Sequence, residues 1–263
     1  MPRITRYISK KISEIIKPGD KVLIKYECGL GDVIMFLPYY ERLKQMFPEV
    51  KFDLKTKNQG MFFKFNTNPS YYNWIFRCNS FFNEEKPELQ RWTKPECNCV
   101  LQLGIPYDKD IEYTVSLPHK DSPFVGVSYC NSCFPENINC NYEVAKLIWD
   151  KLKENGFVPI ELFSPTYKEA WERDENKKFD FVSCSMRDMG SNLQRMLDVM
   201  ATCRGLASVA TGNFHYGMTI YPDKILYLMN KYTYKYFTNK EILCLDVNKP
   251  DIKIIEEWIK IIA

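Results

Sequence analysis

The sequence predicts an α/β protein of two lobes, each built on a mainly parallel β-sheet. Short runs rich in β-branched residues alternate with segments whose apolar residues recur at helical spacing, which is typical of parallel strands joined by crossover helices. The alternation restarts after the polar stretch "SLPHKDSP" at residues 116–123. For a chain of 263 residues, two lobes of roughly 120 residues fit better than one sheet of about a dozen strands, which would be unusually large.

The first lobe, residues 1–120, is predicted to open with an amphipathic helix over residues 4–16. Pro18-Gly19-Asp20 then forms a turn, and the β-branched run "KVLIKY" at residues 21–26 reads as a buried strand. Residues 32–46 carry apolar side chains at helical spacing and are followed by Phe47-Pro48, which ends the helix. Further strands are expected at "VKFDLK", "WIFRC" and "CVLQL".

The second lobe, residues 121–248, opens with the strand "FVGVSY" and the helix "YEVAKLIWDKLKEN", which stops at Gly156. The next strands are predicted at "FVPIELF", "FDFVSC", "GLASVA" and "KILYLM", with helices at 167–174, in "NLQRMLDVMATC" and from "TGNFHYGM". Residues 249–263 form an apolar-faced helix that is expected to cross back and pack on the first lobe. The predicted architecture is therefore two Rossmann-like lobes with a ligand cleft between them.

The composition argues against nucleic acid as a partner, against a membrane span and against secretion. Lys plus Arg number 36 and Asp plus Glu 33, an excess of three that is too small to predict binding to nucleic acid by bulk charge. No stretch reaches the roughly 18 consecutive apolar residues of a membrane span, although contact of the leading helix with a membrane surface stays open. No secretory leader is recognisable, so we expect a cytoplasmic protein whose ten cysteines are reduced.

Two glycines and an acid, Gly29, Gly31 and Asp32, mark the point where the first strand becomes a helix. A dinucleotide fingerprint would need a third glycine where Ile34 stands, and its ribose-binding acid would be Asp53, which falls inside a strand. An aspartate in the first turn of such a helix stays ionised and faces the ligand crevice, as a general base requires. The alternative is an ordinary helix-capping aspartate, and this motif alone does not separate the two.

Two segments resemble glycosyltransferase family 9, the heptosyltransferase group. "KYECGLGDVIMFLPYYERLKQMFPEVKFDL" is similar to the family's opening, with Pro38 and Phe47-Pro48 at matching places. "LQRMLDVMATCRGLASVATGNFHYGMTIYPDKILYLM" is similar to its most recognisable segment, a helix and a strand followed by Thr-Gly-x-x-His at a helix start. Four residues fill the positions of that second motif: Thr211, Gly212, His215 and Pro222. Both motifs occur in the family's order, and the likeness spans most of residues 21–230.

The resemblance implies the GT-B architecture, with the acceptor on the first lobe and a nucleotide-sugar on the second. It implies an inverting, metal-independent transfer of a hexosyl or heptosyl group to a hydroxyl of a glycan or other acceptor, with no cofactor. Asp32 would be the catalytic base, with Gly29 and Gly31 beside the substrate. The other expected substrate-binding residues are Ser128, Asn131, Thr211, Gly212, Asn213 and His215. Independently, a helix start at Thr211 presents unpaired N–H groups to a diphosphate.

Departures from the family pattern keep other functions open. Ala210 stands where the family has an acid, and the loop "CNSCFPENINCN" at residues 130–141 carries no lysine or arginine. A non-catalytic binding protein of the same fold is therefore an alternative, as is a nucleotide-sugar epimerase. Cys130, Cys133 and Cys140 lack a fourth ligand at the spacing that zinc sites use, so no metal site is expected.

Overall fold

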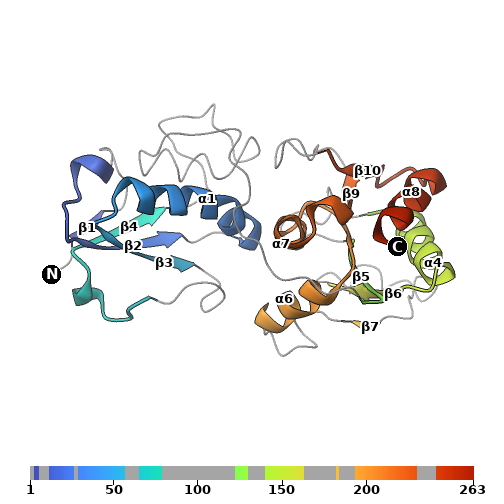
Figure 1. The fold of residues 1–263 in the computed structure, drawn as a ribbon, viewed down its shortest axis with the longest axis horizontal. Helices are drawn as coiled ribbons and strands as arrows, with labels where there is room; N and C mark the ends of the chain where they lie inside the picture. The colour runs from blue at the N-terminus through green and yellow to red at the C-terminus, as the bar shows by residue number, and fades with distance from the viewer. Residues whose placement is uncertain are drawn as a thin grey trace. The chain divides into compact units, whose positions relative to one another are not determined.

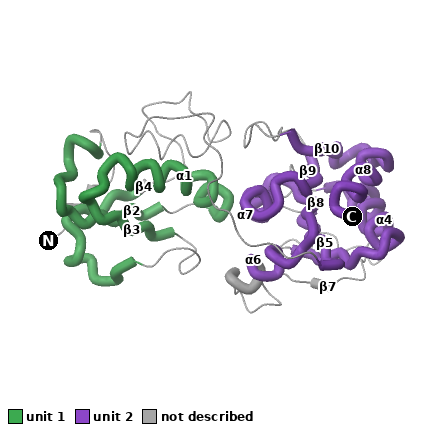
Figure 2. Tube along the Cα trace, in the orientation of Figure 1, with its two compact units in different colours: residues 1–114 green, residues 115–263 purple. Residues whose placement is uncertain are grey.

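The chain consists of two compact units, Met1–Thr114 and Val115–Ala263 (Figure 2). The computed structural model describes residues 3–5, 12–26, 29–56, 65–78, 122–129, 140–162, 182–183, 193–229 and 241–263. Each unit carries its own parallel sheet, which confirms the predicted α/β class with two Rossmann-like lobes. The units divide a few residues before the predicted boundary at 120/121, and both positions lie outside the described residues.

Unit 1 contains a parallel sheet whose strand order reverses at β2. Its described strands are β1 (Arg3–Thr5), β2 (Lys21–Tyr26), β3 (Lys51–Thr56) and β4 (Trp74–Cys78), in the order β1-β4-β2-β3 (Figure 1). The chain runs from β2 outward to β3 and then returns to the other side of β2 for β4. Open α/β sheets bind ligands at the carboxyl ends of the strands where the order reverses in this way. The segment that follows β2 therefore starts at the expected ligand edge.

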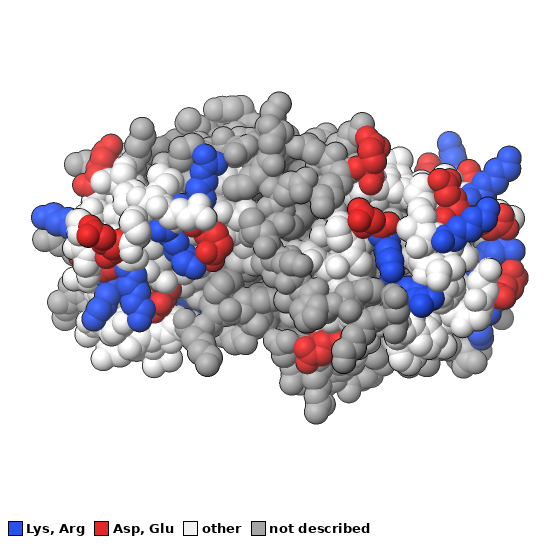
Figure 3. All heavy atoms as spheres, viewed as in Figure 1, with Lys and Arg blue, Asp and Glu red and all other residues white. Residues whose placement is uncertain are grey.

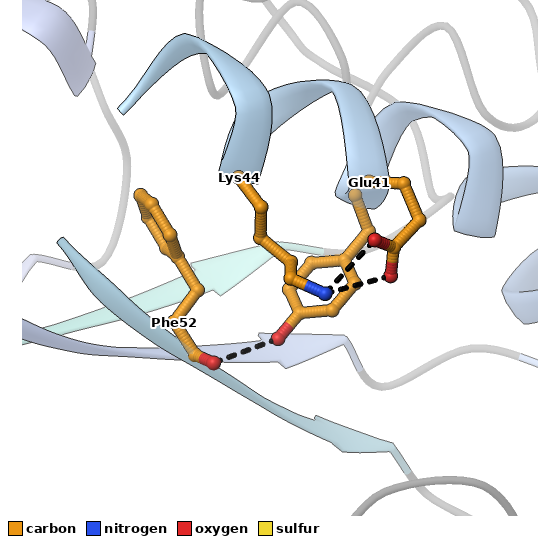
Figure 4. A network of polar contacts seen from close by, with 4 residues as sticks. Glu41, Lys44 and Phe52 are labelled. Atoms are coloured by element: carbon orange, nitrogen blue, oxygen red, sulfur yellow. Dashed lines mark hydrogen bonds and ion pairs between the residues drawn. The ribbon is translucent and has the colours of Figure 1, made fainter. Parts of the chain in front are cut away.

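Helix α1 (Leu30–Met46) follows β2 and packs its apolar side on the sheet (Figure 1). The buried side chains run without a gap from Val33 to Tyr40 and include Leu43, so the first part of the helix is covered on more than one side. The Phe36 and Tyr26 ring centres lie 4.9 Å apart, and the Tyr40 hydroxyl donates a buried hydrogen bond of 2.9 Å to the Phe52 carbonyl of β3 (Figure 4). These contacts fix the position of the helix, which begins at Leu30 rather than at the predicted residue 32.

The predicted leading helix over residues 4–16 is wrong. Arg3–Thr5 forms strand β1, which pairs in parallel with β4 in the register Arg3↔Trp74, and Ile12–Glu14 forms only a short 3-10 turn (η1). A second 3-10 turn, η2 (Pro69–Tyr71), precedes β4. The edge of β4 on the side away from β2 needs hydrogen-bond partners, and β1 supplies them. Long-range backbone pairing thus overrides the local amphipathic pattern.

Unit 2 has the strand order of dinucleotide-binding Rossmann folds. Its described strands are β5 (Phe124–Ser128), β6 (Val158–Glu161), β7 (Val182–Ser183), β8 (Leu206–Ser208), β9 (Ile225–Met229) and β10 (Leu243–Asp246). They are all parallel, in the order β10-β9-β8-β5-β6-β7, so the order reverses between β5 and β8. The described helices are α4 (Tyr142–Glu154), α6 (Leu193–Thr202), α7 (Gly212–Ile220) and α8 (Ile252–Ile262), with a 3-10 turn, η3, at Pro222–Lys224. Strand β10 was not predicted.

The C-terminal helix α8 buries its apolar face within unit 2, beside α4, β9 and β10 (Figure 1). Its buried residues Ile255, Trp258, Ile259 and Ile262 belong to one core with the β5 and α4 side chains. The indole N–H of Trp258 donates to the Lys224 carbonyl at 3.2 Å. The prediction that this apolar face packs on the first lobe is therefore wrong, because its side chains belong to the core of unit 2. The missed strand β10 extends the sheet of unit 2 and offers α8 a nearby apolar surface.

Other predicted elements agree with the structure where it describes them. Gly156 follows α4 with φ +79°, and Gly19 has φ +84° in the predicted turn after Pro18. The predicted strand "CVLQL" and the predicted helix over 167–174 lie outside the described residues. No helix in the described ranges is long and apolar enough to cross a membrane.

Candidate active site

Asp32 is the third residue of α1, and its carboxylate accepts a hydrogen bond from the backbone at the start of the helix. Gly29 is the N-cap residue, and its N–H donates to Asp32 Oδ2 at 3.2 Å. The Asp32 side chain is partly exposed. The positive end of the helix dipole lies at this turn and favours a negative charge. The geometry therefore suits both predicted roles, because the group caps the helix and also places a carboxylate at the ligand edge of the sheet.

Neither backbone strain nor packing explains the glycine at position 29. Gly29 has φ −66° and ψ 165°, an extended conformation that any residue adopts, and it is exposed. A Cβ at this position would lie 3.5 Å from Asp32 Oδ2, which is an ordinary contact. Gly31, the second residue of α1, is partly buried. What a side chain at position 29 would change is access to the Asp32 carboxylate.

Hydroxyl side chains gather in unit 2 where the strand order reverses. Ser128 ends β5, Ser208 ends β8, and the two residues are partners in the parallel register. Ser208 Oγ lies 3.3 Å from Thr211 Oγ1 and donates to the Val209 carbonyl at 2.8 Å. Sequence reasoning missed Ser208. A hydroxyl residue that ends an otherwise apolar strand was the available signal.

Helix α7 begins directly beyond β8, and its first N–H groups have the geometry of an anion site. Thr211 is the N-cap, and its Oγ1 accepts from the Phe214 N–H at 3.4 Å. Gly212 and Asn213 are the first two residues of the helix, so their N–H groups have no intrahelical acceptor. Within the described part of the chain, no other acceptor contacts these two N–H groups. Helix N-termini of this kind bind phosphate groups.

The side chains of Asn213 and Ser128, both predicted to contact substrate, bond to each other. Asn213 is 9% exposed and Ser128 is 1% exposed. The Asn213 amide donates to Ser128 Oγ at 3.1 Å and to the Leu162 carbonyl at 2.6 Å. The structure therefore brings together Ser128, Thr211, Gly212 and Asn213, but it directs the amide group of Asn213 inward.

His215 is buried in the first turn of α7, with 5% of its surface exposed. Its ring packs edge-on against Phe214, with 5.2 Å between ring centres. Burial lowers the pKa of His215 from 6.5 to about 3, because the interior disfavours the charged imidazolium. The imidazole is therefore neutral at physiological pH and adds no positive charge for a diphosphate.

Some of the predicted residues lie outside the described residues. Asn131 is one of them, as are all the other residues of 130–139, including Cys130 and Cys133, and the cysteines Cys97 and Cys99. Cys140 is buried, and Ala210 is partly buried at the position of the missing acid. Among the described residues, no group of three or more His, Cys, Asp or Glu side chains is arranged to hold a metal ion.

Asp53, the acid of the alternative dinucleotide reading, has a local partner within unit 1. It lies in the middle of β3 and accepts a hydrogen bond of 2.6 Å from the Tyr72 hydroxyl. Ile34, at the position of the third glycine, is 1% exposed in the core. Both residues therefore have structural roles that do not require a dinucleotide.

Charged side chains of both signs are interleaved on the face seen in Figure 3. Acidic and basic residues of the described chain alternate over α4 and α8, as in the ion pair of Lys146 with Asp150 and that of Lys151 with Glu154. A single-sign stripe that would follow a nucleic-acid backbone does not appear among the described residues on this face. This agrees with the small net charge of +3.

Structural comparison identifies the fold. No protein-family model and no curated protein sequence matches the chain. A glycosyltransferase family 9 structure from Veillonella parvula matches with a TM-score of 0.56 and 13% identity, over 88% of this chain and 87% of that one. E. coli heptosyltransferase WaaC with ADP matches with a TM-score of 0.58 and 12% identity, over 92% of this chain and 100% of that one. E. coli ADP-heptose lipopolysaccharide heptosyltransferase II matches with a TM-score of 0.60 and 10% identity, over 92% of this chain and 98% of that one. The chain therefore has the GT-B fold of the glycosyltransferase family 9 heptosyltransferases.

Proposed function

We propose that this protein is an inverting glycosyltransferase that moves a sugar from a nucleotide-sugar donor to a hydroxyl of a glycan or similar acceptor. The observation that carries the proposal is the position of Asp32. Its carboxylate lies in the first turn of α1, directly beyond β2, where the strand order of unit 1 reverses. A partly exposed, ionised group at this edge has the charge and the fixed direction that a general base for a hydroxyl needs.

Asp32 would remove the proton of the acceptor hydroxyl. As that oxygen forms a bond to the anomeric carbon, the bond from this carbon to the diphosphate breaks, and the nucleoside diphosphate leaves. The proton stays on the Asp32 carboxylate. A single displacement of this kind inverts the anomeric centre. Unit 1 is thus the proposed acceptor lobe, and the exposed Gly29 leaves room beside the base.

The nucleotide-sugar would bind to unit 2, at the carboxyl ends of β5 and β8. The N–H groups of Gly212 and Asn213 and the hydroxyl of Thr211 would hold the diphosphate, because they begin a helix at the reversal of the strand order. Similar structures support this choice of ligand, since WaaC has been solved with ADP and, separately, with ADP-2-deoxy-2-fluoro heptose. The neutral His215 would donate at most one hydrogen bond. The mechanism needs no metal ion, so activity should survive EDTA.

The sequence departures favour one alternative, a non-catalytic binding protein with the same fold. Ala210 replaces the acid of the family pattern, and the amide of Asn213 is engaged within the protein. Such a protein would still bind a nucleotide or a glycan but would release no nucleoside diphosphate. An epimerase would convert the donor without an acceptor, so product analysis separates all three functions.

A thermal-shift screen with ADP, UDP, GDP and CMP, and with their sugar conjugates, tests the proposal. At least one nucleotide should raise Tm, because a ligand at about 100 times its Kd stabilises the folded state by about 2.7 kcal/mol. The stabilising sugar conjugate is then incubated with glycan acceptors, with and without EDTA, and the released nucleoside diphosphate is measured. The absence of any shift across the panel would refute the proposed donor site, whereas a shift without acceptor-dependent release would favour the non-catalytic alternative.

A further inference from the structure

A buried amide joins three separate segments at the ligand edge of unit 2. One Asn213 N–H donates to Ser128 Oγ at the end of β5, and the other donates to the carbonyl of Leu162, directly after β6. A side-chain amide has two N–H donors, so this arrangement engages both of them. The Leu162 carbonyl only accepts hydrogen bonds, which fixes the orientation of the amide with its nitrogen toward Leu162.

The segments on either side of this bridge are themselves fixed by the sheet. The Leu162 N–H donates to the Val127 carbonyl of β5 at 2.8 Å, and the Val209 N–H donates to the Ser128 carbonyl at 3.0 Å. Ser128 therefore connects to the β8–α7 turn through its backbone and to α7 through its side chain. Asn213 provides the corresponding connection from the first turn of α7 back to β5 and β6.

The bridge lies in a nearly dry environment. Ser128 is 1% exposed and Asn213 is 9% exposed, while Leu162 is 1% exposed. Loss of the amide would leave a buried hydroxyl and a buried carbonyl without these donors, and the first turn of α7 would move to find other partners. The N–H groups of Gly212 and Asn213 lie in that same turn.

We infer that Asn213 is a positioning residue: its side-chain amide fixes the first turn of α7 to β5 and β6, and so sets the affinity for the diphosphate without contacting it. This inference rests on the proposed function, in which that turn binds a nucleoside diphosphate. It also revises the predicted role of Ser128 and Asn213, whose side chains act on each other. A turn held in place before the ligand arrives loses less conformational freedom on binding.

The test compares Asn213→Leu, which keeps the approximate side-chain size, with Ser128→Ala, which removes only the hydroxyl. Thr219→Val is the matched control, because its hydroxyl is also buried in α7 but donates to Tyr216 of the same helix at 2.7 Å. Affinity for the nucleotide that stabilises the wild type best is measured by calorimetry. Asn213→Leu should weaken it by about tenfold or more, Ser128→Ala less, and Thr219→Val by less than about twofold.

Two readouts separate positioning from direct contact and from a general loss of stability. In Asn213→Leu, kcat/KM for the donor should fall while KM for the acceptor stays within about threefold, since the proposed acceptor lobe is the other unit. Hydrogen exchange without nucleotide should accelerate at the hydrogen-bonded amides of residues 214–216 in both Asn213→Leu and Ser128→Ala. The double variant should exchange no faster than Asn213→Leu alone, because the two residues share one bond.

The outcomes are distinguishable. Unchanged exchange at residues 214–216 in Asn213→Leu would overturn the positioning role, and so would a nucleotide affinity equal to that of the wild type. If Asn213→Leu weakens binding while exchange at residues 214–216 keeps the wild-type rate, Asn213 contacts the nucleotide directly. If Ser128→Ala changes neither exchange nor affinity, the bond to Ser128 does not position the turn, although the Leu162 bond remains. Either result contradicts the inference, which assigns the turn to both β5 and β6. A wild type that binds no nucleotide refutes the proposed function instead, and the exchange measurement still decides whether the amide holds the turn. Should Asn213→Leu fail to fold, Ser128→Ala alone carries the same comparison.

Discussion

Replacing Asp32 with asparagine separates the two roles of its carboxylate. Asparagine keeps an oxygen that accepts the Gly29 N–H, which is 3.2 Å away from Asp32 Oδ2 in the structure. It loses the negative charge at the start of α1, and it cannot accept the proton of an acceptor hydroxyl. Capping is thus largely preserved in Asp32→Asn, while base catalysis is removed.

The two effects differ in size enough to be distinguished. The lost interaction with the helix dipole should lower the free energy of unfolding by about 0.3–1 kcal/mol. Loss of a general base should lower kcat by about 10²-fold or more, which raises the activation free energy by at least about 2.7 kcal/mol. A purely capping aspartate would produce the first effect alone.

The assay measures release of nucleoside diphosphate at saturating donor and acceptor, beside urea unfolding of the same protein samples. Asp251→Asn is the matched control, because Asp251 caps α8 in unit 2 and its carboxylate accepts from the Lys253 and Ile254 N–H groups. That variant should show a similarly small loss of stability with unchanged kcat. An Asp32→Asn protein whose kcat stays within about threefold of the wild type would refute the proposed mechanism.

Two further predictions concern stability, one for unit 2 and one for unit 1. The folded protein keeps His215 neutral down to about pH 3, whereas the unfolded chain binds a proton below pH 6.5, so stability falls as the pH is lowered between these values. From pH 7.5 to pH 5, the wild type should lose about 2 kcal/mol more unfolding free energy than His215→Gln, and equal losses in urea titrations would contradict the low pKa. Tyr40→Phe removes the buried hydrogen bond to Phe52 (Figure 4) and should cost about 1–3 kcal/mol in the same measurement. Lys44→Met removes the exposed ion pair with Glu41 and the contact of the Lys44 ammonium with the Tyr40 ring, and it should change the free energy of unfolding by less than about 1 kcal/mol. A larger effect of Lys44→Met than of Tyr40→Phe would contradict the stabilising role of the buried hydrogen bond.

Elements with strong local signals were predictable. The run "KVLIKY" is strand β2 with the predicted bounds, and "YEVAKLIWDKLKE" is helix α4, ended by Gly156 with positive φ. In both, a dense apolar pattern coincides with turn or cap residues, so local preference and tertiary packing agree. The edge strands were harder, because the short β1 and the short β10 carry little signal and exist through pairing with β4 and β9.

The candidate site was only partly predictable. Asp32 and Thr211 were found because each follows a buried strand at the start of a helix. The sequence does not show that Asn213 would bond to Ser128, since 85 residues separate them along the chain. Nor does it show that His215 is buried and neutral, because its burial depends on the packing of α7 against the sheet.

By itself, the sequence determined the alternation of strands and helices, the division into two lobes and the residues at the two helix starts, since these follow from local periodicity, turn chemistry and motif spacing. Only the tertiary structure decided which strands are neighbours, where α8 buries its apolar face, and which polar side chains at the ligand edge of unit 2 bond to each other. Those outcomes depend on contacts between residues far apart in the chain, and such contacts leave no periodic trace in a single sequence.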